Sequence, residues 1–137
     1  GITMDNLGWE AVETSKKSFE KAEPLFLKII DLNPEYPAGN RILADAYFRK
    51  KDYKNAAIWY EKFLKLSPPF INWCEEIETK TSWEKFQFRI FLKSTSDFEN
   101  SIDNLKKSYE NINNQEDAKQ YDSIIKCVKN YRKIKNI

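Results

Sequence analysis

One pattern of residues occurs twice in this 137-residue chain, with a constant spacing of 34 residues. The copies lie over residues 18–34 and 52–68, and the coinciding pairs are Ser18 and Asp52, Phe19 and Tyr53, Ala22 and Ala56, Phe26 and Tyr60, and Pro34 and Pro68. An internal period between about 20 and 50 residues is typical of stacked supersecondary units. We therefore expect a repeat architecture, whose extended surface serves binding rather than catalysis.

The side chains of the second copy fit two helices that cross closely. The small residues Ala44 and Ala56 stand where the two helices would approach each other most closely. The large side chains of Leu43, Tyr47 and Tyr60 would fill the space around this crossing. Asp52 is placed to cap the second helix, and Pro68 ends it because proline cannot continue a helix. We expect helices at about 37–50 and 53–66, antiparallel because so short a connection permits little else.

These residues resemble the tetratricopeptide repeat, which has a Leu-Gly pair, a Tyr, an Ala, a Phe and a terminal Pro at fixed positions. Those positions are taken here by Leu43-Ala44, Tyr47, Ala56, Tyr60 and Pro68. Asn40 departs from the family, which usually has Trp there, and Phe63 stands where the family mostly has Ala. The resemblance is closest over residues 18–68 and partial over 82–113. It implies an all-α fold of antiparallel helical hairpins, stacked as a short right-handed superhelix.

We expect a single domain over residues 1–137 with about seven helices. Its parts are an atypical first repeat (1–34), the clear repeat (37–68), an insert (69–81), a degenerate repeat (82–113) and a C-terminal capping helix (114–137). The insert is predicted because the next copy of the cap pattern begins at Asp97, which is 45 residues after Asp52 rather than 34. The capping helix is predicted from an apolar stripe at helical spacing: Tyr121, Ile124, Ile125, Val128 and Tyr131.

The resemblance implies a non-catalytic protein–protein interaction module that binds a peptide segment or partner protein on its concave surface. The first helices of successive repeats would form that surface, and the partner-binding residues predicted on it are Arg41, Asp45, Phe48, Arg49, Trp83 and Phe86. Arg41 and Arg49 suit a carboxylate through paired hydrogen bonds. Asp45 stands where family members that clamp a C-terminal carboxylate have an asparagine. Binding of a C-terminal carboxylate is therefore disfavoured.

Alternative interpretations of the same residues stay open. Arg41, Asp45 and Arg49 are spaced as an ion-pair ladder along one helix, which is a structural role. The aromatic residues Trp73, Trp83 and Phe86 fit the filling of an enlarged core, or an exposed ledge that contacts a partner or a second copy in a homo-oligomer. The chain could also be an accessory domain of a larger protein. Nucleic-acid or acidic-surface binding by the basic residues 129–135 is less favoured, because the helix macrodipole accounts for them.

Composition narrows the classes of function. The chain has no histidine, and it has neither a glycine-rich phosphate loop nor an arrangement of nucleophile and base. We therefore expect no enzyme, no cofactor, no metal and no small-molecule substrate. The net charge of +2 gives no strong field toward nucleic acid. No apolar run approaches the roughly 20 residues of a membrane span.

The two cysteines, Cys74 and Cys127, form no CxxC pair and have no histidine beside them. This favours two reduced thiols in a cytoplasmic, reducing location. A disulfide between the insert and the last helix is the alternative, and a signal or anchor upstream of Gly1 also stays open.

Overall fold

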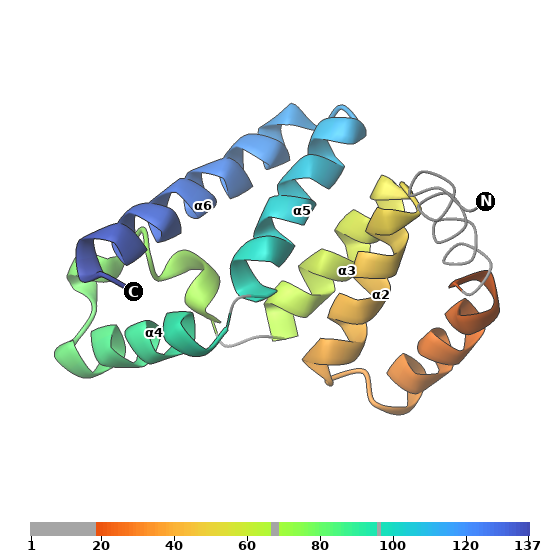
Figure 1. The fold of residues 1–137 in the computed structure, drawn as a ribbon, viewed down its shortest axis with the longest axis horizontal. Coiled ribbons are helices and arrows are strands. Elements are labelled where there is room, and N and C mark those ends of the chain that lie inside the picture. The colour runs from red at the N-terminus through yellow and green to blue at the C-terminus, as the bar shows by residue number, and fades with distance from the viewer. Residues whose placement is uncertain (1–18, 67–68, 96) are drawn as a thin grey trace, which may run out of the picture.

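The fold is described by a computed structural model over residues 19–66, 69–95 and 97–137. These residues form a helix at 19–32, α2 (Pro37–Arg49), α3 (Tyr53–Leu66), α4 (Ser82–Ser94), α5 (Asp97–Asn111) and α6 (Gln115–Lys135). Two short 3-10 helices, Pro69–Asn72 and Ile77–Thr79, precede α4. No strand occurs among the described residues. The predicted all-α class is therefore confirmed (Figure 1).

Helices α2 and α3 form the antiparallel hairpin that the repeat pattern predicts. Leu43, Ala44, Ala56 and Tyr60 are completely buried at their crossing, as expected for small and large residues that interlock. Asp52 caps α3, since its Oδ1 accepts a hydrogen bond from the backbone N–H of Asn55 at 3.4 Å.

The residue that replaces the family's usual Trp has a structural role of its own. Asn40 is buried, and its Nδ2 donates to the backbone carbonyls of Tyr36 at 3.1 Å and Pro34 at 3.4 Å. These bonds tie the turn that precedes α2 to the body of that helix. They also satisfy an amide that would be costly to bury alone.

The helix at 19–32 packs on the outer side of α2. The rings of Phe19 and Tyr47 meet edge to face with centroids 5.2 Å apart, and the Tyr47 hydroxyl donates to Glu23 Oε1 at 2.5 Å. This helix runs through Pro24 without interruption.

The turn between α2 and α3 contains a backbone conformation that disfavours its side chain, which gives a first testable prediction. Lys51 has φ 67°, in the left-handed region, whereas its neighbour Lys50 has φ −75°. Because glycine adopts positive φ without steric cost, Lys51→Gly should raise the free energy of unfolding by about 0.5–1 kcal/mol. Lys50→Gly is the matched control and should lower it by about the same amount. Urea titrations of both variants would measure this, and equal effects of the same sign would refute it.

The second hairpin of the structure is formed by α5 and α6, and this differs from the sequence analysis. Helix α5 packs along α6 and against α3, so the α5/α6 hairpin stacks on α2/α3 (Figure 1). The sequence predicts a hairpin over residues 82–113 and a separate capping helix over 114–137. In the structure α4 meets α5 near their junction, where Phe91 and Phe98 lie 4.9 Å apart, but does not pair along it.

The inserted segment is therefore longer than predicted. It covers residues 69–95 rather than 69–81 and includes α4. Its buried side chains explain why α4 lies apart from α5. Phe88 is fully buried, and the centroid of its ring lies 5.2 Å from that of Tyr131 on α6 and 6.0 Å from that of Phe70. The ring centroids of Phe91 and Phe70 are 4.4 Å apart. Helix α4 thus closes an aromatic core with α6 and the 3-10 segment.

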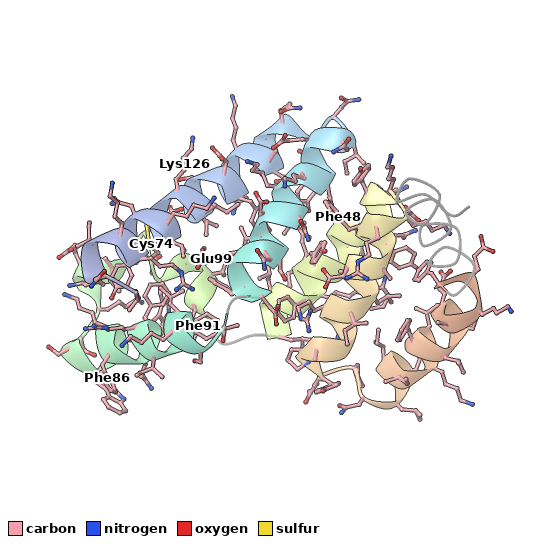
Figure 2. The ribbon with its side chains drawn as sticks, in the orientation of Figure 1. Phe48, Cys74, Phe86, Phe91, Glu99 and Lys126 are labelled. Carbon is pink, nitrogen blue, oxygen red and sulfur yellow. A yellow bond between two sulfur atoms is a disulfide. The ribbon has the colours of Figure 1, made fainter. Side chains whose placement is uncertain are left out.

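A disulfide fastens this segment to the last helix. Cys74 and Cys127 are bonded, with a Cα–Cα distance of 6.1 Å, so the favoured expectation of two reduced thiols is wrong and the alternative holds (Figure 2). Spacing in the sequence could not decide this, since proximity arises only when the segment folds beneath α6. Disulfides persist mainly in oxidising compartments, so the bond does not support the expected cytoplasmic location.

Helix α6 follows the predicted stripe closely. It is capped by Asn114, whose side chain accepts from the backbone N–H of Asp117 at 3.3 Å, and it buries Ile124, Ile125, Val128 and Tyr131. Across the described ranges, no helix combines the length and the apolar character needed to cross a membrane.

Candidate functional site

A groove of about 410 Å³ lies between α2 and α5. The α2 side consists of Arg41, Asp45, Phe48 and Arg49, the four residues that the sequence analysis selected on this helix. The α5 side contributes Asp97, Asn100, Ser101, Asp103, Asn104 and Lys107. Four of the six residues predicted to bind a partner therefore line one groove, and its opposite wall is α5 rather than α4.

A chain of hydrogen bonds fixes the floor of this groove. Asp45 Oδ2 accepts from Arg41 Nη1 at 3.2 Å, and Asp45 Oδ1 accepts from the hydroxyl of the buried Tyr60. Asn104 Nδ2 in turn donates to the Tyr60 oxygen at 3.0 Å. The network joins α2, α3 and α5, so it sets the distance between the two walls.

Tyr60 is held as a neutral donor in this network. Burial, reinforced by the bond to Asp45, raises the pKa of the Tyr60 phenol well above its usual value near 10. The Tyr60 proton therefore stays available to Asp45 at all ordinary pH values.

The predicted ion-pair ladder on α2 is only half formed. Arg41 pairs with Asp45 and lies 3.9 Å from Asp97, but among the described residues Arg49 forms no ion pair. Arg49 is exposed at the rim of the groove beside the half-buried Phe48. An unpaired guanidinium next to an aromatic ring is suited to an acidic group of a ligand.

The groove is close to electrical neutrality. Three cations, Arg41, Arg49 and Lys107, stand against three acids, Asp45, Asp97 and Asp103. Lys107 is paired with Asp103 at 3.0 Å. Hydrogen bonding and local pairing, rather than a strong field of one sign, therefore determine what this surface can hold.

Trp83 and Phe86, also predicted as partner-binding residues, do not line this groove. Both lie on α4 and are exposed, at 65% and 52%, so the core-filling interpretation is wrong for them. Trp73 differs, since it is half-buried and packs edge-on against Phe70 at 4.6 Å.

Sequence reasoning missed the α5 wall, above all Asn100 and Asn104. These asparagines are one helical turn apart, opposite the buried Ile102 and Leu105. The i, i+4 pair of carboxamides was the available signal. This signal is masked because the sequence predicts α5 as the second helix of its hairpin, which would face away from the groove.

The basic end of α6 is partly used within the fold. Arg132 donates to Glu99 and to the backbone carbonyl of Leu92, and Lys126 pairs with Asp122 at 2.8 Å. Among the basic residues 129–135, Arg132 therefore has a structural role. Figure 2 shows Glu99 beneath α6 and Lys126 on its outer side.

Comparison with known proteins identifies the central hairpin. Residues 42–70 match the family described as tetratricopeptide repeat, which covers most of α2, all of α3 and the start of the 3-10 segment. No match is found among curated proteins. Repeats of this family generally serve protein–protein interaction and not catalysis. The match thus supports a general interaction role, carried by the hairpin that supplies one wall of the groove.

Proposed function

We propose that the α2/α5 groove binds an extended segment of a partner protein and that the chain works as a non-catalytic interaction module. The observation that carries this proposal is the shared lining of one groove by four residues of α2, three of which lie in the matched repeat, and by two asparagines of α5. The Asp45–Tyr60–Asn104 network preorganises both walls, which lowers the cost of ordering them on binding.

Asn100 and Asn104 are suited to the backbone of such a segment. A carboxamide both donates and accepts hydrogen bonds, so it matches a peptide group whatever the side chain. Residues i and i+4 of a helix are separated by about 6 Å along its axis. Two residues of an extended strand cover about 6.6 Å, so the two asparagines fit alternate residues of a bound strand.

Arg49 and Phe48 are suited to the side chains of the bound segment. Arg49 has no ion pair among the described residues and would bind an acidic side chain, while Phe48 offers an apolar contact beside it. Both Asp45 oxygens already accept hydrogen bonds, so Asp45 has little capacity left for a ligand cation. The preferred segment is therefore acidic at one position and otherwise mixed in character.

This proposal predicts a specific loss of peptide affinity. Peptides would be selected from a random 12-residue library on the wild-type protein, and their affinities measured by titration calorimetry. Arg49→Glu should weaken the acidic consensus peptide at least tenfold, because it replaces a charge-assisted hydrogen bond by repulsion. Lys129→Glu is the matched control, since Lys129 is exposed on α6 outside the groove, and it should retain wild-type affinity.

Backbone recognition is tested with the same peptide. N-methylation at the residues that meet Asn100 and Asn104 removes their N–H donors and should abolish binding, whereas methylation elsewhere should not. Equal affinity of wild-type and Arg49→Glu, or indifference to all N-methylation, would exclude the groove as the binding site.

A further inference from the structure

Helix α4 carries an exposed apolar ridge away from the α2/α5 groove. Trp83, Phe86 and Ile90 are spaced i, i+3, i+7 and are 65%, 52% and 47% exposed. The rings of Trp83 and Phe86 lie nearly parallel, with centroids 5.7 Å apart and planes inclined by 25°. Figure 2 shows Phe86 pointing away from the body of the protein. We call these three residues the α4 ridge.

The α4 ridge is held rigidly from behind. The opposite face of α4 buries Phe88 and Leu92 in the aromatic core. Its first turn is fixed by a capping box in which Thr81 and Glu84 each bond to the backbone of the other. Its last turn is fixed by Arg132, whose Nη2 donates to the Leu92 carbonyl at 2.6 Å. Aromatic side chains presented by a fixed helix are typical interface anchors.

The two edges of the ridge differ in charge. At 100° per residue, Arg89 and Lys93 lie one turn apart along one edge, and Gln87 and Ser94 lie along the other. Both cations are exposed, and neither forms an ion pair within the described part of the chain. The ridge is thus apolar in the middle, cationic on one side and uncharged on the other.

We infer that the α4 ridge is a second docking surface, which inserts into an apolar groove of a partner protein bordered by acidic side chains on one side. A groove encloses a ridge from both flanks, so it would bury the faces as well as the tips of Trp83 and Phe86. Arg89 and Lys93 would then meet the acidic border and set the orientation of the partner.

The observations favour this occupant over the two other candidates. Three partly exposed side chains offer on the order of 350 Å² of apolar surface, which is too little for a stable homodimer at roughly 800 Å² per partner but is compatible with a transient complex. Antiparallel two-fold pairing of ridges would also place the cationic edges of both copies side by side. An anionic bilayer presents uniform charge, which would be matched by cations on both edges rather than on one.

Differential selection tests the inference without knowledge of the natural partner. A random library of 16-residue peptides would be selected on the wild-type protein and depleted on the double variant Trp83→Ala/Phe86→Ala. The recovered peptides should combine apolar residues with an excess of Glu and Asp. Ile90→Ala should weaken them about three- to tenfold, and Arg89→Glu/Lys93→Glu at least tenfold. The matched control Ile58→Ala, a similarly exposed isoleucine on α3, should have no effect.

Other outcomes overturn the inference. Recovered peptides without acidic enrichment would refute the charge match, and failure to recover any ridge-dependent peptide would refute the docking surface. Trp83-dependent binding to phosphatidylserine vesicles would assign the ridge to a membrane. A dimer in sedimentation that Trp83→Ala dissolves would assign it to a second copy. Because Arg49→Glu leaves the ridge intact, it should not affect these peptides, so the two proposals fail independently.

Discussion

Reduction of the Cys74–Cys127 disulfide is expected to lower the free energy of unfolding by about 4 kcal/mol. The bond joins residues 53 apart in the sequence, and closing a loop of that length restricts the unfolded chain far more than the folded one. Domains of this size have about 5–15 kcal/mol of stability in total, so the loss should be visible as a large shift in the denaturation midpoint. Guanidinium titrations with and without dithiothreitol measure it directly.

The double variant Cys74→Ala/Cys127→Ala separates the covalent bond from other effects of the reductant. This variant should have the same free energy of unfolding as the reduced wild-type protein, and dithiothreitol should not change it. A wild-type protein whose midpoint is unchanged on reduction would show that the bond does not constrain the unfolded chain.

Alkaline pH is expected to destabilise the fold steeply above about pH 10. Four tyrosine hydroxyls donate to carboxylates: Tyr47 to Glu23, Tyr60 to Asp45, and both Tyr109 and Tyr121 to Glu61. Burial above all, and then these neighbouring carboxylates, raise the pKa of all four phenols well above 10.

The sign follows from proton binding. Above pH 10 the unfolded chain loses these phenol protons while the folded chain keeps them, so stability is full below pH 10 and falls as the pH rises. Each phenol contributes a slope of about 1.4 kcal/mol per pH unit, and four together give about 5.6 kcal/mol per pH unit. Urea titrations between pH 9 and 12 test this. Tyr60→Phe should reduce the slope by one proton, which is about 1.4 kcal/mol per pH unit. An equal slope in Tyr60→Phe would be inconsistent with the network at the groove floor.

The sequence predicts the α2/α3 hairpin well because its information is local. Leu43, Ala44, Ala56 and Tyr60 pack within one helical pair, so their spacing alone determines the fit. The helix that pairs with α5 cannot be predicted in the same way. The cap pattern at Asp97 indicates where a helix starts, but it does not determine which neighbouring helix this one packs against. That choice depends on contacts between distant residues, such as Phe88 with Tyr131 and Cys74 with Cys127.

The same distinction divides the candidate sites. The α2 wall of the groove follows from the period of one repeat, whereas Asn100 and Asn104 reach the groove only because α5 stacks on α3. On α4 apolar residues occupy both faces, so periodicity could not tell the buried Phe88 from the exposed Phe86. The side that faces inward is chosen by α6, which lies far along the chain.

A charge exchange across the groove tests the central claim most directly. The acidic residue of the selected 12-residue peptide would be changed to lysine, and both peptides titrated into wild-type protein and Arg49→Glu. If the groove holds the peptide as proposed, the lysine peptide binds Arg49→Glu at least tenfold more tightly than it binds the wild type, and the acidic peptide shows the reverse order. Identical ranking of the two peptides on both proteins would show that the partner does not meet Arg49, and would contradict the proposed function.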